Sequence, residues 1–271
     1  FANVVTRRLG DRLAGTETIN EPWCVAWLTP FCGIHAPGLR DIRAAGHAMH
    51  HVLLAHANAM TALRANKVKN LGIVLNLEVA EPASDSEADR KAAQTYDGIY
   101  FRWFLSALFG KGYPEDVLDG LRSHLPYRWQ FDMNKIAQEM DWLGLNYYTR
   151  KHIAADPSAP WPATTDVPHN GDSTAIGWEI YPRGLTDFLD WTSKTYSGDL
   201  PIYITENGLA SNDTISTQGI DDPQRLSFLQ GHFDAVKTAI DQGAPVMGYF
   251  VWSLLDNFEW ALGYDARFGI V

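Results

Sequence analysis

Two carboxylates in this sequence stand at the ends of short apolar stretches, where they could act on a ligand. Glu21 follows the run ETIN (17–20), and Glu206 lies near the end of the run PIYITEN (201–207). β-Branched and aromatic residues are typical of buried strands, so packing alone does not call for a carboxylate at the tip of such a strand. A pair of carboxylates can supply the acid and the nucleophile or base of glycoside hydrolysis.

Other side chains suited to binding a sugar also stand at predicted strand ends. Asn20 precedes Glu21, and Asn146 and Tyr148 share one face of the predicted strand WLGLNYY (142–148), because side chains alternate along a strand. A third group follows the last predicted strand: Trp252, Asp256, Glu259 and Trp260. Tryptophan rings can stack on the apolar faces of sugars, and amide and carboxylate groups can bind hydroxyls.

Each of these features also has a simpler interpretation. Glu21 before a proline can be an ordinary loop residue, and tryptophans are often part of a core. The residues Glu206, Asn207 and Gly208 can form a hairpin turn, because Asn-Gly favours the type I′ turn. The following residues, 209–212, do not continue as a pairing strand, which argues against the hairpin.

The elements that carry these residues alternate between strand and helix. Five strands are predicted, at 17–20, 71–77, 142–148, 201–207 and 246–254, and helices at 41–66, 88–109, 115–121, 183–196 and 223–242. This alternation indicates a parallel α/β fold. The second and fifth strands are almost continuously apolar, as is typical of strands covered on both faces. Asp221 and Asp222 are expected to cap the last helix.

The number of strands limits the architecture. A (β/α)₈ barrel takes about 250 residues, so a chain of 271 residues could hold a whole one. Five strands cannot close a barrel, and an open sheet exposes its edges. The sequence therefore predicts an α/β chain with an incomplete (β/α)₈ TIM barrel, in which about strands 4 to 8 are present.

Charge and motifs exclude several classes of function. The net charge of −10 and the lack of a basic run argue against nucleic-acid binding, and no apolar run is long enough to span a membrane. Cys24 and Cys32 are expected to be reduced thiols. His47 and His51, four residues apart on a predicted outer helix, leave zinc binding open as a weaker alternative. No nucleotide-binding glycine motif occurs.

Longer motifs carry a family resemblance. The stretches TINEPW (18–23), HAPG (35–38), LGLNYYT (143–149), GWEIYP (177–182), YITENG (203–208) and WSLLDNFEW (252–260), with RFG (267–269), resemble glycoside hydrolase family 1, the β-glucosidases. The motifs occur in the family's order and span the whole chain. The resemblance implies a retaining β-glycosidase that hydrolyses terminal non-reducing β-D-glycosides by double displacement.

The resemblance also implies roles for individual residues. Glu21 looks like the general acid/base and Glu206 like the nucleophile, to which Tyr148 should donate a hydrogen bond. The other residues implied in substrate binding are Asn20 at the sugar 2-hydroxyl, Asn146 beside Tyr148, Trp252 under the ring, Glu259 and Trp260 at the far hydroxyls, Phe268 in the same pocket and Trp178 as the platform for the leaving group.

The implied substrate is a β-glucoside or a short β-linked oligosaccharide. Glu259 would repel a phosphate at close range, whereas relatives acting on 6-phosphosugars carry a hydroxyl and cations there, so an unphosphorylated sugar is preferred over a 6-phospho-β-glycoside. No metal or organic cofactor is implied, and neither nucleic acid nor membrane is an expected partner. A cytoplasmic location is the expectation.

The family's barrel begins before Phe1 and ends after Val271. Residues 1–271 are therefore expected to form a partial catalytic domain that lacks the first three βα units and the last helix. Because part of the sugar pocket belongs to those units, the isolated chain is expected to be weak or inactive. Two alternatives stay open: a truncated sugar-binding or pseudo-enzyme module, and a partial barrel completed by a second copy or a complementing chain.

Overall fold

The structure, a computed structural model, describes residues 1–217 and 219–271. The chain divides into two compact units. The first comprises residues 1–76, 95–145 and 200–202, and the second comprises residues 77–94, 146–199 and 203–271. The strands β2, β3 and β5 each contribute residues to both units.

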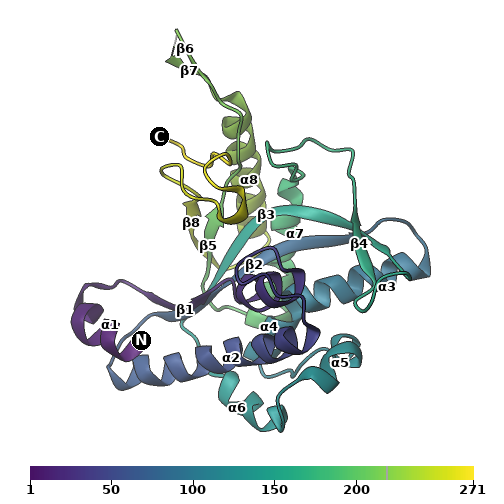
Figure 1. The fold of residues 1–271 in the computed structure, drawn as a ribbon. Coiled ribbons are helices and arrows are strands. Elements are labelled where there is room, and N and C mark those ends of the chain that lie inside the picture. The colour runs from purple at the N-terminus through teal and green to yellow at the C-terminus, as the bar shows by residue number, and fades with distance from the viewer. Residues whose placement is uncertain (218) are drawn as a thin grey trace. The chain divides into compact units, whose positions relative to one another are not determined.

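All five predicted strands form, although their ends differ from the prediction. The strands are β1 (Thr16–Asn20), β2 (Leu71–Pro82), β3 (Trp142–Ala155), β4 (Thr164–Val167), β5 (Ile202–Asn207), β6 (Ile215–Ser216), β7 (Gly219–Ile220) and β8 (Val246–Val251). The order in the main sheet is β1-β2-β3-β5-β8, with β4 antiparallel to β3, while β6 and β7 form a separate pair (Figure 1).

All five predicted helices form, two of them with a π-helical segment, and the described residues also form short helices at 2–9 and 133–136. The helices are α1 (Ala2–Leu9), α2 (Ile42–Ala65), α3 (Glu87–Asp97), α4 (Trp103–Leu108), α5 (Glu115–Leu121), α6 (Met133–Ile136), α7 (Pro182–Thr192) and α8 (Pro223–Asp241). The single helix predicted at 88–109 is divided into α3 and α4 by the π-helical segment Gly98–Arg102. Another π-helical segment, Ser193–Ser197, replaces the end of the helix predicted at 183–196.

Local sequence explains where the two longest helices begin. The Asp41 carboxylate accepts hydrogen bonds from the backbone N–H groups of Arg43, at 2.8 Å, and Ala44, at 3.1 Å, at the start of α2. Asp222 accepts one from Arg225 N–H, at 3.2 Å, and Pro223 occupies the first turn of α8. The predicted cap on the last helix is therefore confirmed for Asp222.

The core of the first unit lies along α2. Met49, Leu53 and Met60 on this helix are fully buried. His50 is also fully buried, and its ring contacts the Tyr113 hydroxyl at 2.8 Å and the Asp132 carboxylate at 3.2 Å. His50 thus links α2 to the segment that follows α4.

Among residues 1–217 and 219–271, no three or more His, Cys, Asp or Glu side chains come together in a group that could hold a metal ion. Within the same residues, no helix combines the length and the apolar character that crossing a membrane requires. Cys24 and Cys32 form no disulfide in the structure.

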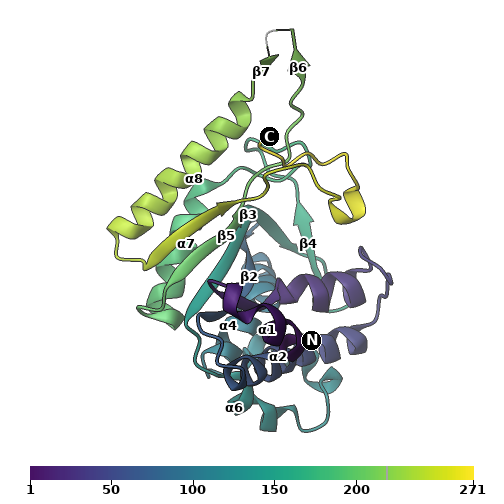
Figure 2. The ribbon, with the colours of Figure 1, turned by 90° about the vertical axis from the view of Figure 1, so that its left-hand side faces the viewer.

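The second unit is built on β3, β5 and β8, with α7 and α8 beside them. Figure 2 shows α8 running alongside β8, and the Thr186 hydroxyl of α7 donates a hydrogen bond to the Ala235 carbonyl of α8, at 2.8 Å. Tyr147 on β3 and Phe228 on α8 are almost completely buried.

The strands predicted at 71–77 and 246–254 were both expected to be buried on both faces, and this holds only for the first of them. Residues 71–78 of β2 are all buried. On β8, however, Met247 and Phe250 are 65% and 58% exposed, so the expectation is wrong there. The physical reason is that β8 is an edge strand. Among the described residues it has a neighbouring strand on one side only, so fewer side chains lie beside its own and shield them from solvent.

Acid is expected to destabilise the second unit through His232 on α8. This side chain is fully buried, its Nδ1–H donates to the Phe228 carbonyl at 2.8 Å, and burial lowers its pKa to about 4. Above pH ~6.5 the ring is neutral in both the folded and the unfolded chain, so it does not affect stability. Between pH ~6.5 and 4 only the unfolded chain takes up the proton, which lowers the free energy of unfolding by up to about 3 kcal/mol.

The test is urea unfolding at pH 7 and pH 4.5. His232→Gln keeps a hydrogen-bond donor but removes the titrating group. The fall in its free energy of unfolding from pH 7 to pH 4.5 should therefore be smaller than that of the wild type by about 2–3 kcal/mol. His51→Gln, at an exposed position of α2, is the matched control and should behave like the wild type. An unchanged pH dependence in His232→Gln would contradict the assignment.

Candidate active site

Glu206 lies near the end of β5 in the second unit, and a tyrosine from β3 holds its carboxylate. The Tyr148 hydroxyl donates a hydrogen bond to Glu206 Oε2 at 2.7 Å. The expected contact is therefore present. A hydroxyl that donates to a carboxylate favours the ionised form, which is the form that can act as a nucleophile.

The residues after Glu206 fix the strand end in place. Asn207 is fully buried, its Nδ2 donates to the Tyr147 carbonyl at 2.7 Å, and its Oδ1 accepts from the Tyr249 hydroxyl. A Cβ atom at Gly208 would overlap the backbone carbonyl of Trp252, so glycine is required there. The chain leaves β5 without pairing back on it, and the alternative of a hairpin turn at 206–208 is wrong.

Asn146 lies on β3 two residues before Tyr148, as the sequence predicts. Its side chain is fully buried, and its Oδ1 accepts a hydrogen bond from the Thr205 hydroxyl at 2.6 Å. Asn146 on β3 thus holds the residue next to Glu206 on β5. This contact links β3 to β5 directly beside Glu206.

Aromatic side chains gather around Tyr148. Its ring lies 5.4 Å from that of Trp178 and 6.1 Å from that of Phe268, and Trp178 and Phe268 are 6.3 Å apart. Trp252 packs against the same cluster, which is centred on the buried Ala210, Ala266 and Phe268. The structure therefore brings together four of the predicted residues beside Glu206: Tyr148, Trp178, Trp252 and Phe268. Phe268 is buried among them and is only 1% exposed.

The loop after β8 carries the remaining predicted residues of this unit. Glu259 accepts a hydrogen bond from Asn257 Nδ2 at 2.8 Å, and Trp260 is 68% exposed. The loop is tied to the RFG stretch through Asp256, which accepts from Arg267 Nε at 3.0 Å and from Gly269 N–H at 2.8 Å. This tie through Asp256 was not predicted from the sequence.

Glu21 belongs to the first unit and directly follows β1. The parallel register between β1 and β2 shifts between Glu17 and Asn20, as happens at a β-bulge. Glu21 then adopts a φ of 51°, in the left-handed region that non-glycine residues rarely occupy, and its N–H donates to the Val74 carbonyl at 3.0 Å. Such backbone conformations cluster at functional sites, where they aim a particular side chain.

The Glu21 carboxylate has a thiol neighbour that the sequence did not indicate. The Cys24 thiol donates to Glu21 Oε2 at 3.2 Å, and Asn76 Nδ2 donates to the Cys24 sulfur at 3.7 Å. Cys24 lies at the start of the π-helical segment Cys24–Cys32, three residues after Glu21. Asn20, the last residue of β1, is exposed beside this group.

Two charged residues close to Trp178 in the structure were not predicted from the sequence to belong to the site. Arg150 follows the LGLNYYT motif and Glu179 follows Trp178, and they form a paired contact with Nε–Oε2 at 2.7 Å and Nη2–Oε1 at 2.8 Å. The available signal was their position, since Arg150 directly follows the LGLNYYT motif and Glu179 is part of the GWEIYP motif. Their pairing across 29 positions of sequence could not be seen from the sequence.

Parallel strands linked by helices, with acidic side chains just after the strands, are typical of α/β-barrel enzymes. The active sites of these enzymes form at the C-terminal ends of the strands. Comparison with known proteins narrows this class. The family model described as glycosyl hydrolase family 1 matches residues 1–271. The chain belongs to this family, as the motifs predicted, and its fold is that of part of a (β/α)₈ barrel, which confirms the predicted fold class.

Individual relatives agree with this assignment. A β-glucosidase of Agrobacterium sp. (strain ATCC 21400) is 43% identical over 100% of this chain and 60% of its own length. A 1,4-β-D-glucan glucohydrolase of Thermotoga neapolitana is 42% identical, over 100% of this chain and 64% of its own length. The structure of a family 1 β-glucosidase from Thermotoga maritima has a TM-score of 0.95 at 41% identity and covers 100% of this chain, which spans 61% of that structure.

Proposed function

We propose that this chain carries both catalytic carboxylates of a retaining β-glucosidase, with Glu206 as the nucleophile and Glu21 as the general acid/base. The observation that carries the proposal is the Tyr148–Glu206 hydrogen bond beside the aromatic cluster, in a chain of this family. Relatives named β-glucosidase, and a Thermotoga maritima β-glucosidase in complex with deoxynojirimycin, support a terminal β-D-glucoside or a short β-linked oligosaccharide as the substrate.

The proposed reaction has two displacements. In the first, a Glu206 oxygen bonds to the anomeric carbon while the bond to the leaving oxygen breaks, and Glu21 gives its proton to that oxygen. In the second, Glu21 takes a proton from water, the water oxygen bonds to the anomeric carbon, and Glu206 is released as a carboxylate. Retention requires the two carboxyl groups to be about 5–5.5 Å apart in the active protein.

The remaining residues receive supporting roles in this proposal. Asn20 would bind the 2-hydroxyl of the sugar, Trp252 and Phe268 would line the ring site, and Trp178 would be the platform for the leaving group. Asn146 would take part in substrate binding beside Tyr148, and it also accepts a hydrogen bond from Thr205.

The carboxylate of Glu259 decides between two candidate substrates. With Trp260, it is proposed to bind the hydroxyls farthest from the scissile bond. A dianionic phosphate next to this carboxylate would be repelled, which favours unphosphorylated gluco-, galacto- or fuco-glycosides over 6-phospho-β-glycosides. Relative kcat/KM values for the nitrophenyl glycosides of each sugar and for the 6-phosphoglucoside should place the phosphorylated substrate last.

We also propose that the catalytic domain includes barrel elements beyond residues 1–271. The support is that the chain spans 60% of one relative's length and 61% of a related structure. The intact mass of the natural protein tests this proposal, and size-exclusion chromatography separates it from a barrel completed by a second chain. A cytoplasmic location is proposed as well, and the free cysteines Cys24 and Cys32 are compatible with it.

The experiment that tests the proposed function is hydrolysis of a nitrophenyl β-glucoside by the protein in its full natural length, followed by NMR. The first sugar product should be the β-anomer, which later equilibrates. An α-anomer as the first product would show inversion and contradict the proposal. Binding of glucosides without turnover would instead support the alternative of a sugar-binding module.

Replacing Tyr148 with phenylalanine is expected to slow the reaction while the fold stays intact. A hydrogen bond to a charged group contributes about 1.5–3 kcal/mol, so kcat/KM should fall about 10- to 100-fold. The phenyl ring keeps its contacts with Trp178 and Phe268, so the melting temperature should stay close to that of the wild type. Tyr127→Phe, at a position that is 87% exposed, is the control and should change neither quantity.

A further inference from the structure

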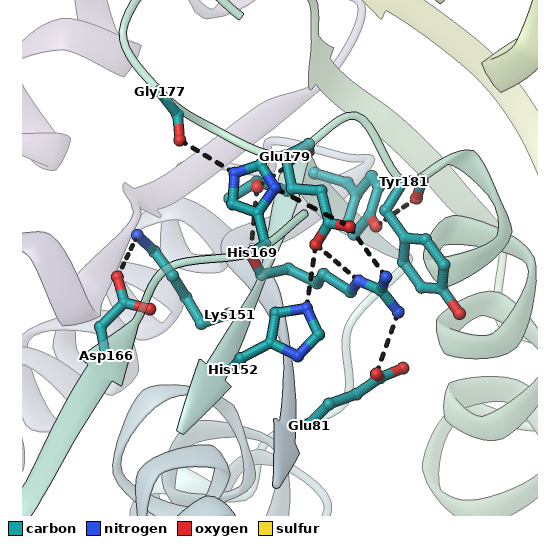
Figure 3. Close-up of polar contacts among 11 residues, drawn as sticks. Glu81, Lys151, His152, Asp166, His169, Gly177, Glu179 and Tyr181 are labelled. Carbon is teal, nitrogen blue, oxygen red and sulfur yellow. Dashed lines mark hydrogen bonds and ion pairs between the residues drawn. The ribbon is translucent and has the colours of Figure 1, made fainter. Parts of the chain in front are cut away.

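The two neighbours of Trp178 in the chain face an environment that differs from the aromatic cluster. Gly177 and Glu179 both line a cavity of about 210 Å³, together with Arg150, His152 and His169 (Figure 3). The Trp178 ring packs instead against Tyr148 and Phe268. The segment 177–179 therefore separates a polar cavity from the aromatic side of the proposed active site.

Glu179 is the centre of the polar contacts in this cavity. Its side chain is only 4% exposed, and both of its oxygens accept hydrogen bonds from Arg150, at 2.7 and 2.8 Å. His152 Nε2 lies 3.2 Å from Glu179 Oε2. Because the Arg150 hydrogen bonds favour the carboxylate, the pKa of Glu179 lies below its usual range. Two-pronged contacts of this kind between arginine and a carboxylate are strong and fix the orientation of both groups.

Arg150 is itself held from two other directions. Its Nη1 donates to Glu81 Oε2 at 2.9 Å, and its guanidinium lies 3.8 Å from the centre of the Tyr181 ring (Figure 3). Arg150 belongs to β3, the strand that also carries Tyr148. The carboxylate of Glu179 is thus anchored to β3, the strand whose Tyr148 donates a hydrogen bond to Glu206 on β5.

The backbone around Trp178 is held in the same way. The Thr149 hydroxyl donates to the Glu179 carbonyl at 2.9 Å. Thr174 pairs with Trp178 twice, with Thr174 N–H donating to the Trp178 carbonyl at 2.8 Å and Trp178 N–H donating to the Thr174 hydroxyl at 3.1 Å. These contacts leave the Trp178 backbone little freedom, so the direction of its ring depends on the anchors on either side.

We propose that Glu179 and Arg150 are positioning residues that aim the Trp178 ring and so set the affinity for the leaving-group part of the substrate. The inference rests on the proposed function, because it takes Trp178 as the platform for the leaving group. Neither Glu179 nor Arg150 touches the substrate. Loss of the paired contact between Arg150 and Glu179 lets the Trp178 ring shift. Small misplacements of this kind can lower the rate by up to about 100-fold.

Two substrates with the same sugar separate this effect from general damage. Nitrophenyl β-glucoside has a leaving group large enough to contact Trp178, whereas β-glucosyl fluoride has one that is too small. Glu179→Gln keeps the shape of the side chain but removes its charge. It should lower kcat/KM about 10-fold for the nitrophenyl glucoside and leave the value for the fluoride unchanged. Arg150→Lys, which keeps the charge but loses the paired geometry, should act in the same way if Glu179→Gln does not fold.

A matched control lies at the same cavity. Asp166 pairs with Lys151 at 2.7 Å and is 48% exposed, so Asp166→Asn removes an ion pair there without removing a contact made by residues 177–179. This variant should retain wild-type kinetics on both substrates.

A double-mutant cycle tests whether Glu179 acts through Trp178. In a Trp178→Ala background, Glu179→Gln should have no additional effect on nitrophenyl glucoside hydrolysis, whereas a general structural effect would persist. Equal losses on both substrates, no loss on either, or additive effects in the cycle would each overturn the inference. A wild-type protein that cleaves neither substrate would overturn the proposed function itself, which is a distinct outcome.

Discussion

Glu206→Ala is expected to abolish nearly all hydrolysis of β-glucosides. The variant lacks the atom that bonds to the anomeric carbon, and it also removes the anion to which Tyr148 donates at 2.7 Å. Loss of the nucleophile should lower kcat/KM by about 10⁴-fold or more, equivalent to ~5.4 kcal/mol of transition-state stabilisation. The measurement is the initial rate on nitrophenyl β-glucoside with the full natural protein, together with the melting temperature as a check on folding.

The stereochemistry of rescue makes this prediction sharper. A small anion such as azide can occupy the space left by the carboxylate and attack the anomeric carbon directly. Because that is a single displacement, the product should be the α-glucosyl azide. Activity in Glu206→Ala close to that of the wild type would rule out Glu206 as the nucleophile, and a β-glucosyl azide would place the missing group on the other side of the sugar.

Glu21→Ala is expected to produce losses that depend on the leaving group. A general acid contributes about 10²- to 10⁴-fold, and only when the leaving oxygen needs a proton. A short β-linked glucan should therefore lose activity by about that factor, whereas cleavage of a dinitrophenyl glucoside should be much less affected in its first step. The measurement is kcat/KM across a series of leaving groups that differ in acidity.

Azide gives the opposite product in this variant. The glycosyl-enzyme on Glu206 still forms from an activated substrate, and azide then displaces it without a base, which yields the β-glucosyl azide. Equal losses for activated and unactivated substrates would contradict the role of Glu21. The Cys24 thiol, 3.2 Å from Glu21 Oε2, offers a control: Cys24→Ala removes this donor but retains the acid, so it should not change the dependence on the leaving group.

Sequence patterns predicted the elements of this site well, because the periodicity of strands is local. The run 201–207 identified β5 to within one residue and placed a carboxylate at its end. Alternation along β3 predicted that Tyr148 faces the site, and its hydrogen bond to Glu206 agrees. The same alternation placed Asn146 on the face of Tyr148. Its buried contact with Thr205 on the neighbouring strand could not be known from local sequence.

Features that depend on tertiary contacts were beyond prediction. The break between α3 and α4 occurs where Gly98 lies against Val117 of α5, a contact that no pattern within residues 88–109 reveals. The strand β3 extends to Ala155 because its outer part pairs with the polar strand β4, whose sequence TTDV resembles a loop. The left-handed conformation of Glu21 likewise follows from the register shift between β1 and β2.

The most direct test of the central claim is to trap the glycosyl-enzyme and locate it. With 2-deoxy-2-fluoro-β-glucosyl fluoride, the fluorine at C2 destabilises both positively charged transition states, while the fluoride leaving group compensates in the first step only. The intermediate should therefore accumulate. Mass spectrometry of the digested protein is predicted to find the sugar bonded to Glu206. A sugar on any other residue, or no adduct in a protein that hydrolyses nitrophenyl β-glucoside, would contradict this account.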